Sequence, residues 1–218
     1  MAKQEQSEGP VCGTDMDIVS IKKLQLPHGV VCPNVWGIAK EQPVLVTIVL
    51  TLRNGLQSAA SKDALDRNTV HYGELAKRIR AASKPNQTLE MLTPTIFAAI
   101  SSLAMRDDGT CKLSQSIVLY HLPKASMYGN NIELVNILLY NSQGKATLMG
   151  RDFGLREANF MALIGVNDYE RTARQPLTVG FDISLSNEPC ASEGAAVSPI
   201  AIFDVERNLA KVCSSHRC

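Results

Sequence analysis

The sequence predicts an α+β fold, in which an antiparallel sheet of ββααββ order packs one face against two helices. Three observations predict it. Two stretches rich in β-branched residues precede two amphipathic helical stretches, and two further strand-like stretches follow. The 218 residues are 45% hydrophobic and 20% charged, a composition typical of a globular protein that buries a core. A partial second copy of the same unit then follows the complete first copy.

The first unit is expected over residues 16–142, after a polar, disordered tail over residues 1–15. An apolar stretch that begins at Ile18 and the β-branched run 44–52 form its first two strands. An unprotected apolar strand at a sheet edge invites pairing with another chain, so the run 44–52 favours an oligomer. The alternative, that the run 44–52 is a core strand in a monomeric sheet, stays open.

The helices of the first unit are predicted by capping side chains and by periodicity. Residues 66–69 offer caps before a charged amphipathic helix over residues 72–79. A second helix follows residues 86–88, because apolar residues recur there at spacings of 3, 4, 4 and 3. They are Leu89, Leu92, Ile96, Ile100 and Leu103. Strands over residues 114–122 and 132–140 complete the unit.

An internal repeat predicts the second unit. An aromatic residue stands six residues before a Gln-Pro pair at Trp36 and again at Tyr169, and a strand-like stretch follows each pair. We expect a linker over residues 143–157, with a turn at Asp152-Phe153-Gly154, and a partial second unit over residues 158–218. This second unit has room for two strands and one helix only.

The charge balance and the absence of targeting signals limit the class of protein. The 22 Lys and Arg residues nearly cancel the 21 Asp and Glu residues, for a net charge of +1, which argues against a nucleic-acid partner. No apolar run is long enough to span a membrane or to form a signal peptide, so we expect a soluble, cytoplasmic protein. The six cysteines and four histidines are scattered, and their spacing predicts neither a disulfide framework nor a metal site.

Three stretches carry a family resemblance. Residues 66–75 (DRNTVHYGEL) and 88–92 (TLEML) resemble the two helix-opening motifs of dihydroneopterin aldolase. Residues 163–175 (LIGVNDYERTARQ) are similar to the opening motif of the same family. The tandem arrangement resembles the aldolase part of fungal multifunctional folate-synthesis proteins. The resemblance implies the tunnelling fold, in which ββααββ units of a homo-oligomer assemble into a barrel and active sites lie between adjacent units.

The resemblance also implies a binding site for a small, flat heterocycle. Glu90 matches a glutamate that anchors the heterocycle by accepting hydrogen bonds from its amino and ring N–H groups. A carboxylate suits this task because it presents two acceptor oxygens in one plane. Leu89 and Val70 stand at further substrate-binding positions of the two helix-opening motifs. The alternative for Glu90 is a solvated carboxylate that the helix dipole stabilises.

The catalytic residues implied by the resemblance are Tyr72, Glu170 and Lys124. Tyr72 matches a tyrosine whose hydroxyl assists proton transfer, and Glu170 matches a glutamate that binds or deprotonates through water. The family's general acid/base lysine precedes a Pro-x-Ala segment, where this chain has Leu122. Lys124 lies two residues further on, on the same face if the strand extends that far. Each of these three residues has a structural alternative: a half-buried tyrosine, a loop carboxylate and a surface lysine.

The expected function is retro-aldol cleavage of a 7,8-dihydroneopterin-type substrate by general acid/base catalysis, without metal or other cofactor. Gly37 replaces the family glutamate in the first unit, and Phe203 replaces the family tyrosine in the second. The two units therefore look complementary, and a composite site across an interface would contain one of each group. Two alternatives stay open: recruitment for another aldol or cyclisation reaction on a small molecule, and a non-catalytic partner of a true aldolase.

Overall fold

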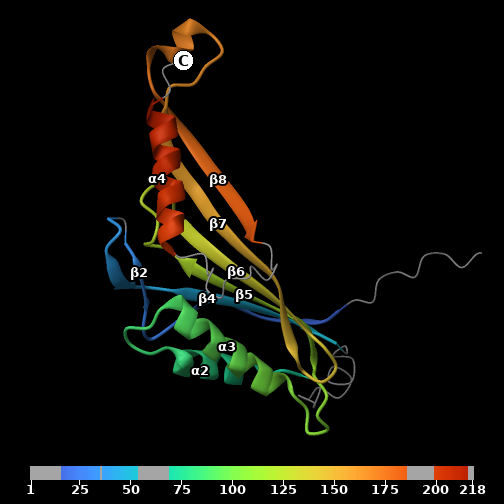
Figure 1. The fold of residues 1–218 in the computed structure, drawn as a ribbon. Helices are drawn as coiled ribbons and strands as arrows, with labels where there is room; N and C mark the ends of the chain where they lie inside the picture. Colours follow the sequence, from blue (N-terminus) through green and yellow to red (C-terminus); the bar gives the residue numbers. More distant parts are fainter. Residues whose placement is uncertain (1–15, 35, 54–68, 186–198, 216–218) are drawn as a thin grey trace, which may run out of the picture.

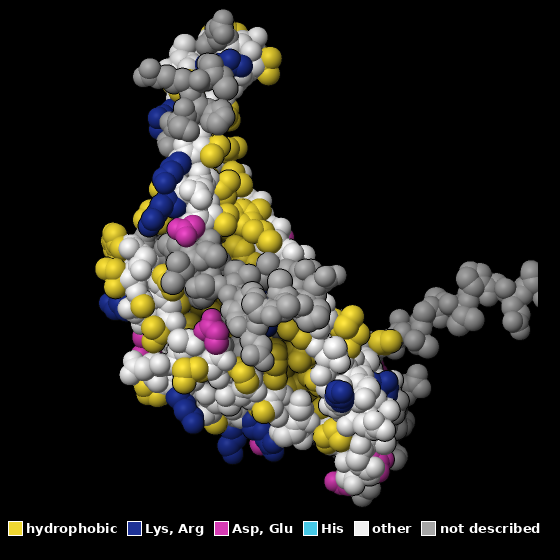
Figure 2. Space-filling model, in the orientation of Figure 1, with side chains coloured by type: hydrophobic (Ala, Val, Ile, Leu, Met, Phe, Trp, Pro, Cys, Tyr) yellow, Lys and Arg dark blue, Asp and Glu magenta, His cyan; other side chains and the backbone are white. Residues whose placement is uncertain are grey.

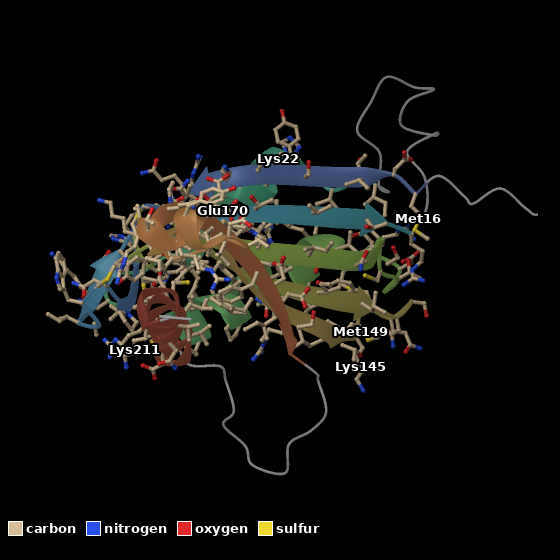
Figure 3. All side chains as sticks on the ribbon, turned by 90° about the horizontal axis from the view of Figure 1, so that it is seen from above. Met16, Lys22, Lys145, Met149, Glu170 and Lys211 are labelled. Carbon is tan, nitrogen blue, oxygen red and sulfur yellow. The ribbon has the colours of Figure 1, made fainter. Side chains whose placement is uncertain are left out.

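A six-stranded antiparallel sheet dominates the computed structural model, which describes residues 16–34, 36–53, 69–185 and 199–215. The strand order is β1-β4-β5-β6-β7-β8, and Figure 3 shows these strands side by side from one edge to the other. The strands are β1 (Ile18–Gln25), β4 (Leu45–Leu52), β5 (Leu113–Leu122), β6 (Asn131–Tyr140), β7 (Ala146–Ala162) and β8 (Gln175–Leu185). The predicted tail over residues 1–15 lies outside the described residues.

Two helices lie between β4 and β5 in the chain and cover one face of the first four strands (Figure 1). They are α2 (Tyr72–Ala82) and α3 (Leu89–Ala104). The order β1, β4, α2, α3, β5, β6 is the predicted ββααββ order, so the α+β class with an antiparallel sheet is confirmed. A small hairpin, β2 (Val30–Pro33) and β3 (Ala39–Gln42), is inserted between β1 and β4.

The core lies between the sheet and the helices. Alternate residues of β4 point into it, namely Val46, Ile48, Leu50 and Leu52, each at most 1% exposed. The buried face of α3 follows the predicted spacing, except that Ala104 closes it where the pattern predicts Leu103. The cap of α2 also differs: His71 Nδ1 accepts from the backbone nitrogens of Gly73 (3.1 Å) and Glu74 (3.2 Å). Residues 66–68, which were expected to help cap this helix, lie outside the described part.

The predicted linker over residues 143–157 is wrong as a description of local structure. Strand β7 begins at Ala146 and pairs with β6 on one side and β8 on the other. Gly154, expected in a turn, lies inside this strand. A Cβ atom there would meet Asp182 Oδ1 at 2.7 Å and Arg156 Nη2 at 3.0 Å, so the glycine leaves room for an ion pair across the strands. Both halves of the chain therefore contribute to one continuous sheet.

The last elements are a short 3-10 helix, η1 (Asp168–Thr172), and α4 (Pro199–Ser215). Figure 1 shows α4 standing beside β7, and partly buried residues of α4 pack against the main core. These are Leu209, Ala210 and Cys213. No helix within the described residues is long and apolar enough to cross a membrane.

Candidate functional site

The start of α3 carries two of the predicted site residues, Leu89 and Glu90. Glu90 is exposed in the first turn, and Leu89 beside it is buried. Thr88 occupies the N-cap position without a capping side-chain hydrogen bond, although the first backbone N–H groups of a helix need outside acceptors. The backbone nitrogen of Val31 donates to Gln87 O at 2.7 Å, which places strand β2 against this end of α3. Glu90 is therefore available to a ligand that approaches over β2.

Two glutamine side chains next to this helix end have buried atoms without hydrogen-bond partners. Gln87 is 5% exposed and its Nε2 is unpaired, and Gln42 is 6% exposed and its Oε1 is unpaired. Gln42 is held in place by its other group, because Nε2 donates to Pro33 O at 2.7 Å and to Cys32 O at 3.1 Å. Buried polar atoms in proteins are almost always paired. An unpaired donor and an unpaired acceptor thus lie on either side of β2, both shielded from solvent.

Cys32 of β2 lies close enough to Glu90 for the charge of the carboxylate to affect its thiol. Its burial and, to a smaller extent, the negative charge of Glu90 raise the pKa of the thiol to about 11. The group is consequently a neutral thiol at physiological pH, which makes it a poor nucleophile and a poor metal ligand. Within the part of the chain that the structure describes, no cluster of His, Cys, Asp and Glu side chains could hold a metal ion.

Lys124 lies on the β5–β6 loop rather than on a strand. Strand β5 ends at Leu122, and the backbone nitrogen of Ala125 closes a turn on Leu122 O at 3.2 Å. The two-residue alternation that would place Lys124 on the face of the family lysine therefore does not apply. Leu122 itself is 1% exposed and packs in the core. Lys124 is exposed, and its role in proton transfer stays a prediction.

Tyr72 and Val70 lie at the other end of the helix pair. The ring of Tyr72 is 67% exposed and stacks on His71, whereas Val70 is buried. Arg78 of α2 donates to Ser102 near the end of α3 at 2.8 Å, so the two helices run antiparallel. An 11-residue helix is about 16 Å long, and Tyr72 and Glu90 are therefore separated by roughly that distance within one chain. One chain does not bring these two predicted site residues together.

Glu170 lies in η1, where it is part of the capping box at the start of this segment. The segment follows β7 at the end opposite Lys145 and Met149 (Figure 3). Its Oε2 accepts from the backbone nitrogens of Val166 (2.7 Å) and Asn167 (3.2 Å). Hydrogen bonds from the Asn167 backbone lower the pKa of Glu170. Glu170 is consequently a good acceptor and a weak base.

The repeat around Gln42 and Gln175 extends to hydrogen bonds. Gln175 Nε2 donates to Ile164 O at 3.2 Å and to Glu170 O at 3.1 Å, just as Gln42 Nε2 donates to two carbonyls at the end of β2, before the turn that leads to β3. The two glutamines therefore close equivalent loops in the two units. The side chain of Phe203 lies outside the described residues, although its position in α4 is described.

A second polar cluster, on the sheet face away from α2 and α3, was not predicted. His121 Nε2 lies 3.0 Å from Thr47 Oγ1, and its Nδ1 lies 3.2 Å from Glu133 Oε1. Arg156 joins Glu133 (2.8 Å) to Asp182 (2.7 Å) across three strands. Burial lowers the pKa of His121, and the charge of Glu133 opposes this shift. No motif in the sequence indicates this cluster, because strand register alone brings its members together.

Comparison of the sequence with models of known families and with curated proteins found no match. The resemblance to dihydroneopterin aldolase, and the roles it gives to individual residues, thus stay predictions.

Proposed function

We propose that this chain binds a flat heterocycle with a donor-rich edge at the start of α3 and cleaves a 7,8-dihydroneopterin-type substrate there. One observation carries the proposal: the carboxylate of Glu90 is exposed in the first turn of α3, where Thr88 provides no side-chain cap. Glu90 accepts hydrogen bonds from the amino and ring N–H groups of the heterocycle.

The reaction we propose is a retro-aldol cleavage without a metal ion. A base removes the proton of the substrate side-chain hydroxyl, the adjacent carbon–carbon bond breaks, and glycolaldehyde leaves. The electron pair of that bond enters the pterin ring, and an acid then protonates the carbon to give 6-hydroxymethyl-7,8-dihydropterin. Lys124 is the group we assign to proton transfer, because the lowered pKa of Glu170 suits that carboxylate to accepting hydrogen bonds instead.

The proposed assembly is a ring of chains that pair β8 with β1 of the next chain. The six strands alternate in direction, so β1 and β8 can pair antiparallel across two chains. The residues of β8 that face the helix side are partly buried or, at Ile183, exposed, and Figure 2 shows hydrophobic side chains gathered there beside α4. They are Leu177, Val179, Phe181 and Ile183. An apolar edge strand of this kind favours association.

The ring would bring Tyr72 and Glu170 to one interface. Helix α4 occupies in the second unit the place of α2 in the first, and it contacts the β5–β6 loop of the unit before it. By repetition, α2 of the next chain begins beside the η1 end of the second unit. Tyr72 would then approach Glu170 of the neighbouring chain, whereas Glu90 stays near α4 of its own chain.

The test is incubation of the purified protein with 7,8-dihydroneopterin, with chromatographic detection of 6-hydroxymethyl-7,8-dihydropterin. Glu90→Gln removes the anchoring charge with little change of shape, and we expect it to abolish product formation. Glu74→Gln is the matched control, since Glu74 is also an exposed first-turn glutamate but pairs with Arg78. Equal turnover by the wild type and Glu90→Gln would overturn the site, and no turnover by the wild type would overturn the reaction.

A second candidate function is binding of a heterocycle without aldol cleavage, either for other chemistry or as a partner of a true aldolase. The observations that favour it are the buried Leu122 at the position of the family lysine and the distance of about 16 Å between Tyr72 and Glu90. It predicts that a pterin binds, that Glu90→Gln weakens this binding, and that no product forms. A fluorescence titration with the pterin distinguishes this outcome from aldolase activity.

A further inference from the structure

The buried carboxylate of Glu206 joins the second unit to the first. Glu206 lies on α4, is 2% exposed, and projects to the β5–β6 loop about 80 residues earlier in the chain. It accepts from the Ser126 hydroxyl and from the backbone nitrogens of Tyr128 at 2.8 Å and Met127 at 3.1 Å. Three donors from three consecutive residues therefore converge on one carboxylate.

This contact orders the loop beyond its own residues. Ser126 Oγ also accepts from the backbone nitrogen of Gly129 at 2.6 Å, which closes the loop on itself. A side chain at Gly129 would meet Arg156 O at 2.7 Å and Ser126 Oγ at 2.9 Å, so the loop lies tightly between Glu206 and β7. Removal of the carboxylate would leave the part-buried backbone N–H groups of Met127 and Tyr128 without this acceptor, and the loop would lose the contact that orders it.

The loop that Glu206 holds is the one that carries Lys124. Only Ala125, 3% exposed, separates Lys124 from Ser126. Helix α4 also contacts β2, the strand that lies against the start of α3. One helix thus touches both the loop of Lys124 and the strand beside Glu90.

We propose that Glu206 is a positioning residue: it fixes the β5–β6 loop so that Lys124 faces the heterocycle held by Glu90. This inference rests on the proposed function, because it assigns Lys124 to proton transfer at that site. In this proposal, the incomplete second unit supports proton transfer in the first unit, because Glu206 positions the loop that carries Lys124. Glu206 itself acts through the loop and does not touch the substrate.

The test combines hydrogen exchange with kinetics on the full chain. In the Glu206→Ala protein we expect the amides of Met127 and Tyr128 to exchange at least about tenfold faster than in the wild type, with β4 and β5 unchanged. We expect kcat for 7,8-dihydroneopterin to fall at least about tenfold while KM changes little, since the anchor is intact. Glu206→Gln keeps the shape and one acceptor oxygen, so it should give intermediate values in both measurements.

Ser126→Ala is the milder variant should Glu206→Ala fail to fold, because it removes one donor to Glu206 and the acceptor for Gly129 but keeps the two backbone contacts of the carboxylate. It should show the same changes at smaller size. Unchanged exchange of Met127 and Tyr128 in either variant would overturn the contact as the source of loop order. A mobile loop with unchanged kcat would overturn the positioning role and leave the proposed function intact. A wild-type protein without turnover would overturn the proposed function and with it the task of Lys124, whatever the exchange shows.

Discussion

Gln87 offers the sharpest test of the packing beside the candidate site, because a single substitution should stabilise the protein. In Gln87→Met a side chain of similar length replaces an amide whose Nε2 is buried without a partner. Leaving a buried donor unsatisfied costs about 1–3 kcal/mol, and an apolar replacement of similar shape removes this cost. We therefore expect the free energy of unfolding to rise by about 1–2 kcal/mol, which corresponds to about 2–4 °C in Tm for each kcal/mol in a protein of this size.

Gln42→Met is the matched comparison, since it has an unpaired atom at the same site but also makes two hydrogen bonds. Its Nε2 donates to two carbonyls of β2, and each such bond contributes about 0.5–1.5 kcal/mol. Loss of both outweighs relief of the unpaired Oε1, so we expect this variant to be less stable by about 1 kcal/mol. The two substitutions, chemically identical, should therefore shift stability in opposite directions.

The assay is urea unfolding at one fixed protein concentration, because association makes apparent stability depend on concentration. The same samples are then titrated with a pterin, for which Gln87→Met should bind like the wild type, because the replaced Nε2 is buried. A Gln87→Met protein that unfolds at lower urea than the wild type would refute the reasoning. It would mean that the amide is already satisfied in the free protein.

Three further substitutions test local features of the structure. His71→Ala should destabilise the protein by about 1 kcal/mol through loss of the α2 cap, whereas His71→Asn should restore most of it, as measured by urea unfolding. Burial lowers the pKa of His121, so the unfolded chain binds its proton more readily, and stability should fall as pH drops from about 7.5 to about 5.5. His121→Gln should flatten this dependence in the same assay. Leu122→Lys places a charge at a site 1% exposed and should cost at least about 3 kcal/mol without creating activity, as unfolding and turnover assays would show.

The first unit could be predicted because its signals are local. The apolar spacing of α3 and the β-branched run of β4 depend on neighbouring residues, and both elements lie where they were expected. Strand β7 could not be predicted in this way, because its glycines read as turn formers. At Gly154 the glycine is required by a guanidinium from the same strand and a carboxylate from β8, and this requirement exists only after the strands pair.

In the candidate site, too, only the features that depend on neighbouring residues could be predicted from the sequence. Glu90 could be placed at a helix start from sequence, because first-turn position depends only on the cap and the periodicity. The unpaired atoms of Gln42 and Gln87 could not, since burial of a side chain depends on what packs over it. The separation of Tyr72 from Glu90 could not be predicted either. The two motifs are close in the chain, but the antiparallel packing of α2 and α3 places these residues at opposite ends of the helix pair.

The two units place different chemistry at equivalent buried positions. Leu75 lies three residues after Tyr72 in α2, and Glu206 lies three residues after Phe203 in α4. Leu75 is 1% exposed and Glu206 is 2% exposed, so both face inward from their helices. The leucine packs in a core that its own unit completes, whereas the glutamate faces backbone N–H groups of the other unit.

This exchange of leucine for glutamate explains how a unit with a single described helix can remain docked. A leucine at position 206 would suit an apolar core but would leave the nitrogens of Met127 and Tyr128 without an acceptor. The carboxylate meets this requirement and ties α4 to the first unit by directional contacts, which an apolar surface of the same size would not do. Glu206 thereby attaches the second unit to the first unit of the same chain. Glu206→Leu should therefore detach α4 more completely than any substitution on the exposed side of this helix.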